Sequence, residues 1–196
     1  DWEATGWTGV MTLPWHLYPA EDHDLKIAPV QELKVLRYGE VKVGDLALGP
    51  GDEVTLDALC SDCMAAQMTL APDGALEYGI KLLCSPDGEE ETTVAYNAQK
   101  GEFVIDFGHS STDKSLAYPQ NTTSQIVPYS CDGGKLDLDI FVDRSVIEIF
   151  VNSDVVLVQR VYPTRADSRQ FKVFARDGSL TMTDVEKWEM DASNPW

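Results

Sequence analysis

The stretch KLDLDIFVDRSVIEIFVN, residues 135–152, decides the fold of this chain. Its first half alternates apolar and acidic side chains with a period of two, the pattern of a strand with one buried and one wet face. The apolar positions are Leu136, Leu138, Ile140 and Val142, and the acidic ones are Asp137 and Asp139. A second β-rich run follows Asp143-Arg144-Ser145. We therefore predict two antiparallel strands joined at a tight corner, with Ile147, Ile149, Phe150 and Val151 in or beside the core.

Short segments of β character recur on both sides of this stretch, separated by turn signals rich in Pro, Asp and Gly. About ten such segments lie between residues 54 and 190, among them MAAQMTLA (64–71) and ALEYGIKLLC (75–84), which we expect to form a hairpin around Asp73-Gly74. The only predicted helix is a short connector over residues 30–39, with Leu33, Val35 and Leu36 on one stripe. Antiparallel strands in this number bury their apolar faces most easily by stacking two sheets. The fold prediction is all-β, a two-layer antiparallel β-sandwich.

The balance of charge limits the classes of partner. Among 196 residues, 33 are acidic and 15 basic, for a formal net charge of −18. Such a chain repels phosphate backbones and anionic lipid surfaces, so neither nucleic acid nor membrane is expected as a partner. No apolar run approaches the roughly 18 residues that a spanning helix needs. The start, Asp1-Trp2, shows neither Met nor a signal peptide, so we expect a processed or excised piece of a longer product.

The four cysteines and one sequon suggest a secreted, extracellular or vacuolar protein. Asn121, in Asn-Thr-Thr, is the candidate glycosylation site. Cys60 and Cys63 form a C-x-x-C without a second such pair, so disulfides or buried thiols are favoured over zinc. If residues 64–71 and 75–84 form a hairpin, Cys63 is the nearest thiol to Cys84, which leaves Cys60 for Cys131. That is one hypothesis among the connectivities that four cysteines allow.

Residue types that could carry chemistry mostly lack the required spacing. His16, His23 and His109 are scattered, so no metal site is predicted, and Ser145 has no nucleophile-elbow motif around it. Glu89-Glu90-Glu91 has the character of a solvated loop.

Asp143 and Glu148 are the serious carboxyl candidates, because glycoside chemistry needs two carboxyl groups facing one another. However, Asp143 at a turn is suited to accepting backbone N–H groups, and Glu148 alternates with Ile147 and Ile149 onto the polar face of a strand. A structural role is favoured for both.

Five stretches in order resemble the C-terminal portion of glycoside hydrolase family 32, the invertases, inulinases, levanases and fructosyltransferases. They are GWTGVMTLP (6–14), PVQELKVLR (29–37), FVDRSVIEIFVN (141–152), RVYPTRADS (160–168) and GSLTMTDVEKWEM (178–190). The resemblance implies a catalytic five-bladed β-propeller followed by a supporting β-sandwich. Residues 1–28 would be the last strand region of the propeller, 29–39 a connector and 40–196 the sandwich. One departure is Leu13-Pro14-Trp15, where the family usually has Leu-Pro-Arg.

The catalytic motifs of that family, W-M-N-D-P-N-G, R-D-P and E-C, do not occur in these 196 residues. No catalytic residue, metal ligand or cofactor is therefore assigned to this chain. The resemblance implies a non-catalytic chain of a β-fructofuranosidase or fructosyltransferase that acts on sucrose or fructans by a retaining mechanism, with an N-terminal propeller chain as its partner.

A second hypothesis is a free-standing, lectin-like sandwich that binds carbohydrate. It would use exposed aromatic side chains, for which Tyr118, Tyr129 and Tyr162 are available. The sequence favours the first hypothesis, and it does not distinguish hydrolysis from transfer or sucrose from inulin or levan.

Overall fold

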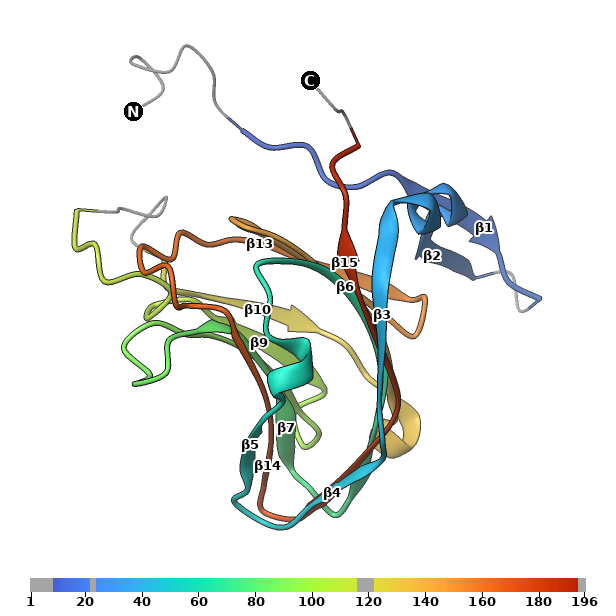
Figure 1. Cartoon of the computed structure of the whole chain (residues 1–196). Coiled ribbons are helices and arrows are strands. Elements are labelled where there is room, and N and C mark those ends of the chain that lie inside the picture. Colours follow the sequence, from blue (N-terminus) through green and yellow to red (C-terminus); the bar gives the residue numbers. More distant parts are fainter. Residues whose placement is uncertain (1–8, 22–23, 116–121, 194–196) are drawn as a thin grey trace.

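Two antiparallel sheets stacked face to face form the body of the molecule in the computed structural model, which describes residues 9–21, 24–115 and 122–193 (Figure 1). The first sheet has seven strands in the order β13-β12-β11-β6-β15-β3, with β4 also paired to β15. Its strands are β3 (Arg37–Val43), β4 (Leu46–Leu48), β6 (Cys63–Asp73), β11 (Leu136–Asp143), β12 (Val146–Val151), β13 (Val155–Arg160) and β15 (Ser179–Met190). Strand β3 spans the predicted domain boundary at residue 40.

The second sheet has six strands in the order β10-β9-β8-β7-β14-β5. Its strands are β5 (Glu53–Thr55), β7 (Glu77–Cys84), β8 (Thr92–Asn97), β9 (Glu102–Asp106), β10 (Ser124–Pro128) and β14 (Gln170–Arg176). Helical structure in the described residues consists of short 3-10 turns, η1 (Gln31–Leu36), η2 (Asp57–Leu59) and η4 (Asp132–Gly134). None of the described helices is long and apolar enough to cross a membrane. The predicted two-layer sandwich is confirmed.

The main core fills the space between the two sheets. Ile140, Ile147 and Ile149 enter it from the seven-stranded sheet, each at most 2% exposed, as their alternation predicts. From the six-stranded sheet come Tyr78, Ile80, Tyr96, Phe171 and Val173. Strands β11 and β12 are paired from Leu138–Val151 to Asp143–Val146, so Asp143-Arg144-Ser145 forms the predicted hairpin corner.

The predicted hairpin of residues 64–71 and 75–84 is wrong. Strand β6 pairs with β11 and β15 in one sheet, whereas β7 pairs with β8 and β14 in the other. The chain therefore crosses from sheet to sheet near Gly74. A second crossing, at Gly178 between β14 and β15, lies against it, and a Cβ at Gly178 would fall 2.1 Å from the backbone carbon of Gly74. Only glycine permits this approach.

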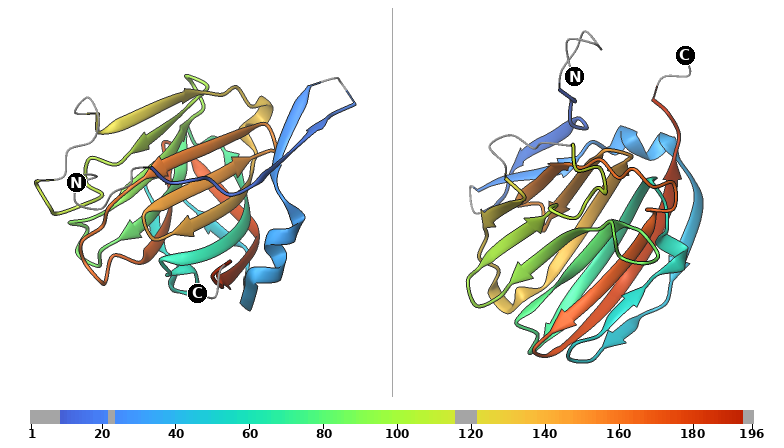
Figure 2. Two further views of the ribbon diagram at one scale, coloured as in Figure 1. Left: turned by 90° about the horizontal axis from the view of Figure 1, so that it is seen from above. Right: turned by 90° about the vertical axis from the view of Figure 1, so that its left-hand side faces the viewer.

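A smaller two-stranded sheet precedes the sandwich in the chain. Strands β1 (Trp15–Pro19) and β2 (Leu25–Pro29) pair with each other and form a ribbon that projects beyond the sandwich (Figure 2). Turn η1 then leads into β3 at the edge of the seven-stranded sheet. In the predicted connector stripe, Leu33 is buried but Val35 is 83% exposed, because the segment is a 3-10 turn and not an α-helix.

Candidate functional site

The outer face of the seven-stranded sheet carries a second apolar cluster, separate from the core between the sheets. Phe141 and Phe150 form its centre, with ring centroids 6.1 Å apart in an edge-to-face arrangement. Residues of the N-terminal segment and of neighbouring strands cover them: Leu13, Ile27, Val30, Leu33, Leu36, Val156, Trp188 and Met190. The N-terminal segment is therefore packed onto the sandwich along this face, which we call the seam.

Glu148 lies in the seam and is only 3% exposed. Its carboxylate accepts a hydrogen bond from the backbone N–H of Leu13 at 2.7 Å and another from Nε1 of Trp15 at 3.1 Å. Burial raises the pKa of the Glu148 carboxyl, and these two hydrogen bonds oppose that rise. The Trp15 ring meets Phe150 edge to face, with centroids 6.2 Å apart.

The prediction that Glu148 lies on the wet face of its strand is wrong in one respect. Its side chain does point away from Ile147 and Ile149 and out of the core, as the alternation requires. That face is dry because residues 13–15 cover it. Asp143 is exposed at the corner, so the two carboxyl groups do not form an open catalytic pair.

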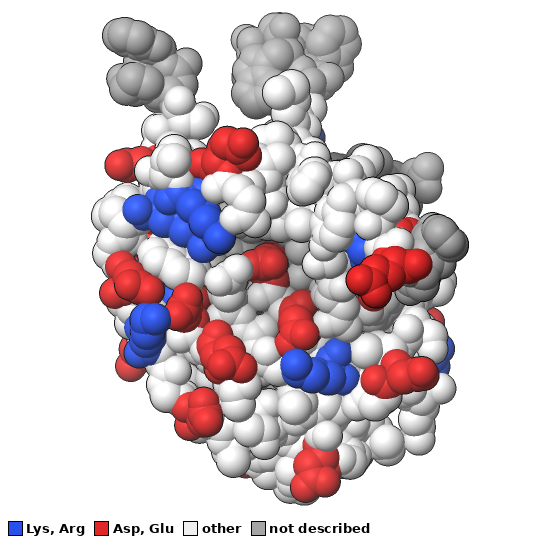
Figure 3. Space-filling view, turned by 90° about the vertical axis from the view of Figure 1, so that its right-hand side faces the viewer, with Lys and Arg blue, Asp and Glu red and all other residues white. Residues whose placement is uncertain are grey.

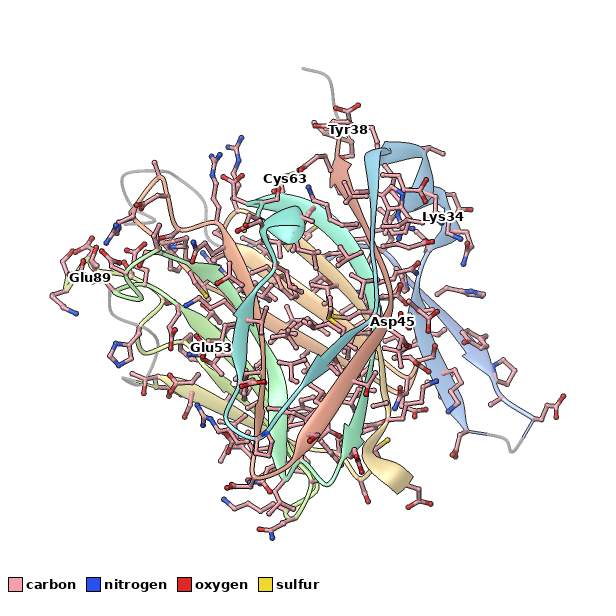
Figure 4. All side chains as sticks on the ribbon, turned by 60° about the horizontal axis from the view of Figure 1, so that its bottom comes forward. Lys34, Tyr38, Asp45, Glu53, Cys63 and Glu89 are labelled. Atoms are coloured by element: carbon pink, nitrogen blue, oxygen red, sulfur yellow. The ribbon has the colours of Figure 1, made fainter. Side chains whose placement is uncertain are left out.

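A polar pocket of about 240 Å³ opens beside the seam, between the N-terminal segment and the outer face of the sheet. Arg37, Gln67 and Asp139 line it, and the amide of Gln67 donates a hydrogen bond to Asp139. The Arg37 guanidinium stacks on Trp188 at 4.1 Å, and burial lowers its pKa. Lys34 on η1 lines the same pocket, next to the β1–β2 ribbon (Figure 4). Acidic and basic side chains are interspersed on the side of the molecule that carries β3 (Figure 3).

The N-terminal segment also presents apolar side chains to solvent. Met11 is 91% exposed, and Val10, Trp15, Leu17 and Leu25 are exposed as well. In the described part of the chain, β1 pairs with β2 alone, so its other edge has open backbone donors and acceptors. Such an edge with apolar side chains beside it is suited to pairing with another sheet.

A buried carboxylate lies at a second place, below the loop that joins β13 to β14. Glu90 is fully buried and accepts hydrogen bonds from the N–H and hydroxyl groups of Thr112 and Thr164, the N–H of Arg165 and the hydroxyl of Ser168. Burial raises the pKa of Glu90, but the hydrogen bonds outweigh it and lower the pKa to about 2. The prediction of a solvated loop over Glu89-Glu90-Glu91 is therefore wrong for Glu90.

The four cysteines are free thiols in the structure. The proposed pairs Cys63–Cys84 and Cys60–Cys131 depended on a hairpin that does not form. Cys63 instead directs its Sγ to the carbonyl of Met190 at 3.5 Å, and Cys84 is fully buried in the other sheet.

The remaining predicted residues do not come together. His16 packs against Tyr18 with ring centroids 5.2 Å apart, and the carbonyl of His109 accepts the N–H of Glu91. His23, Tyr118 and Asn121 lie outside the described residues. Within the described residues, no group of three or more His, Cys, Asp and Glu side chains could hold a metal ion. Tyr129 packs on Phe103, with centroids 5.8 Å apart, and its hydroxyl donates to Asp154.

Residue types alone did not reveal the pocket at the β11–β12 corner, which has a volume of about 230 Å³. Asp62, Arg144, Ser145, Tyr162, Arg165 and Arg169 line it. The sequence does contain a cluster of Arg and Asp in residues 160–169. No motif spacing indicates that this cluster lies next to Arg144 in the fold.

Comparison with known proteins places these features in context. A family model described as Glycosyl hydrolases family 32 C terminal matches residues 34–189. The chain is 27% identical to a sucrose-6-phosphate hydrolase of Zymomonas mobilis, covering 98% of this chain and 36% of that protein. It is 26% identical to a levanase of Bacillus subtilis, covering 91% of this chain and 28% of that protein. It thus spans about a third of the length of these curated relatives.

Among solved structures, the fructan 1-exohydrolase IIa of Cichorium intybus has a similar fold. The TM-score is 0.81 at 18% sequence identity, over 97% of this chain and 43% of that one. A sucrose-6-phosphate hydrolase of Lactobacillus gasseri superimposes with a TM-score of 0.67 at 24% identity, over 90% of this chain and 33% of that one. At these identities the similarity establishes the fold alone.

Proposed function

This chain belongs to glycosyl hydrolase family 32, as its C-terminal part, and on that premise we propose that it supports the catalytic β-propeller of a β-fructofuranosidase or fructosyltransferase. The substrate is sucrose or a fructan, and the propeller, outside these 196 residues, supplies the nucleophile and the acid/base of a retaining mechanism. The sandwich itself binds and orients the propeller.

The observation that carries this proposal is the fixation of the N-terminal segment by Glu148. Two hydrogen bonds from Leu13 and Trp15 to one buried carboxylate hold the entry to β1 in a single position on the sandwich. Strand β1 then presents its open edge outward. We propose that a propeller blade pairs with this edge, so that the sandwich sets the position of that blade.

Exposed apolar surface supports the same assignment. Met11, Leu17 and Leu25 are each more than half exposed on or beside β1 and β2. Burial of this apolar surface favours association, and we expect the interface with the propeller to exceed about 1,000 Å². In this arrangement the sandwich keeps the catalytic carboxyl groups of the propeller in a fixed geometry without contacting substrate.

The proposal is tested by reconstitution. The 196-residue chain and the propeller of the same enzyme are produced separately, and fructose release from sucrose is measured for each part and for the mixture. We expect the chain alone to be inactive, the propeller alone to be impaired, and the mixture to be active. Turnover by the lone chain, or full activity of the propeller without it, would refute the proposal.

A matched pair of variants sharpens this experiment. Glu148→Ala releases Leu13 and Trp15, so we expect it to reduce the activity of the mixture. Asp143→Asn changes an exposed carboxylate at the corner of the same hairpin, so we expect it to leave that activity unchanged. Whether the propeller is a separate chain is tested by intact-mass measurement of the native material.

We further propose that the protein is secreted, extracellular or vacuolar and glycosylated at Asn121. The Asn-Thr-Thr sequon supports this proposal. Endoglycosidase treatment of native material should decrease its mass, and Asn121→Gln should abolish that decrease. An unchanged mass on treatment would refute glycosylation.

A further inference from the structure

The pocket at the β11–β12 corner is built from three separate parts of the chain. Asp62 precedes β6, Arg144 and Ser145 form the corner itself, and residues 162–169 belong to the loop between β13 and β14. In Figure 4, Cys63 marks the start of β6, directly after Asp62. The label Glu89 in the same figure marks the residue whose carboxylate pairs with Arg165. The backbone N–H of Arg144 donates to the carbonyl of Asp62 at 2.7 Å, which joins two of the parts directly.

The loop that forms the other wall is held rigidly from below. Glu90 accepts hydrogen bonds from Thr164, Arg165 and Ser168, so this loop is anchored to a fully buried carboxylate. The N–H of Val161 donates to the carbonyl of Ser145 at 2.9 Å and fixes the loop against the corner. The pocket is therefore preformed, which lowers the entropic cost of binding a ligand.

Arg144 occupies its position at a conformational cost. Its φ is 50°, in the left-handed region where a side chain other than Gly, Asn or Asp is uncommon. Arg144 lines the pocket, and its guanidinium makes no hydrogen bond or ion pair with any residue that the structure describes. By contrast, Arg169 is paired with Asp62 at 3.0 Å. The two-residue turn between β11 and β12 requires that φ, so the feature that points to a ligand is the unpaired guanidinium of this pocket-lining residue.

Arg165 contributes little free positive charge to the pocket. Its guanidinium is paired with the carboxylates of Asp87, Glu89 and Asp167, at 2.6, 3.1 and 2.9 Å. The charges of Asp62 and Arg169, which both line the pocket, offset each other in their ion pair. With a net charge of −18 on the chain, an anionic ligand would meet repulsion as it approaches the molecule.

We propose that this pocket binds one neutral sugar ring, as a saccharide site separate from the catalytic propeller. Sugar hydroxyls both donate and accept hydrogen bonds, so they suit a pocket lined by both Arg144 and Asp62. The apolar C–H face of the ring suits the side chains of Tyr162, Pro163 and Ala166. The volume, about 230 Å³, is below the roughly 300 Å³ at which pockets for larger ligands begin, so it takes a single ring.

The test is a titration of the ¹⁵N-labelled 196-residue chain with fructose, glucose and sucrose, followed by amide chemical shifts. We expect shifts confined to residues 62, 144–145, 162 and 164–169. Inorganic phosphate is titrated in parallel as the anionic probe and should leave these amides unchanged. Because the measurement needs neither the propeller nor turnover, its outcome is independent of the proposed function.

Arg144→Gly is the informative variant, because glycine adopts the left-handed φ without strain and the fold should be kept. Loss of a hydrogen bond to a charged donor should weaken sugar binding at least about tenfold. Arg176→Gln is the matched control, because Arg176 is an exposed arginine paired with Glu77 and does not line the pocket. The proposal is overturned if no sugar shifts the pocket amides, if phosphate shifts them instead, or if Arg144→Gly binds sugar as the unmodified chain does.

Discussion

The indole nitrogen of Trp15 donates a hydrogen bond to the carboxylate of Glu148 at 3.1 Å, across 133 positions of the sequence. This contact joins β1 of the N-terminal ribbon to β12 of the sandwich. The donor in this contact is neutral, and burial raises the pKa of the Glu148 carboxyl.

Trp15→Phe should destabilise the seam while keeping the aromatic contact with Phe150. The carboxylate of Glu148 loses one of its two hydrogen bonds, and we expect the free energy of unfolding at neutral pH to fall by about 1.5–3 kcal/mol. Urea denaturation measures the loss. Tyr18→Phe, on the same strand and without a contact to Glu148, is the control and should change the free energy by less than about 0.5 kcal/mol.

The same pair predicts a dependence on pH. Because the folded-state pKa of Glu148 is raised, the stability that this group contributes is fully present below its unfolded pKa and is lost as pH rises through the folded pKa. In Trp15→Arg the positive charge should lower that pKa, so this variant should lose less stability than the unmodified chain as pH rises. An identical pH profile for the two proteins would contradict this assignment.

Glu90 should act in the opposite direction. Its pKa is lowered to about 2, so its contribution is present above its unfolded pKa of 4.5 and is lost as pH falls toward 2. The lowering of the pKa from 4.5 to about 2 corresponds to about 3 kcal/mol in the free energy of unfolding at neutral pH. We expect Glu90→Gln to destabilise the protein at neutral pH and to flatten its acid-unfolding profile. Glu89→Gln, at the exposed neighbouring position, should do neither.

Truncation in the core should have a large effect. Ile149 is 1% exposed between the two sheets, so Ile149→Ala should cost about 2–5 kcal/mol in the free energy of unfolding. Ile126, on edge strand β10, is 59% exposed, and Ile126→Ala should cost less than about 0.5 kcal/mol. Comparable losses at the two positions would mean that the sheet faces are assigned wrongly.

The cysteines should titrate as four free thiols when the protein is denatured without reductant. In the native protein Cys84 should be unreactive toward iodoacetamide, because burial raises its pKa to about 12 and excludes the reagent. Cys60, Cys63 and Cys131 are only partly buried and should react before Cys84. A titration of fewer than four thiols would indicate a disulfide.

Sequence patterns were sufficient for the sandwich and its inner core. Side chains in a strand alternate between faces by backbone geometry alone, so the alternation of apolar residues by itself assigns Leu136, Ile140, Ile147 and Ile149 to the interior, where they lie. The hairpin corner at Asp143-Arg144-Ser145 could also be predicted, because it lies where one alternating run ends and the next begins.

The positions of Glu148, Glu90 and the thiols were decided by tertiary structure. Glu148 is dry only because residues 13–15 return to cover it, and Glu90 is buried only because Thr164 and Ser168 arrive from another loop. Turn chemistry at Asp73-Gly74 is equally compatible with a hairpin and with a crossing between sheets, and the packing of β6 between β11 and β15 selects the crossing. Local sequence determines which way a side chain points, whereas burial and partners depend on contacts between distant segments, which only the complete packing of the chain defines.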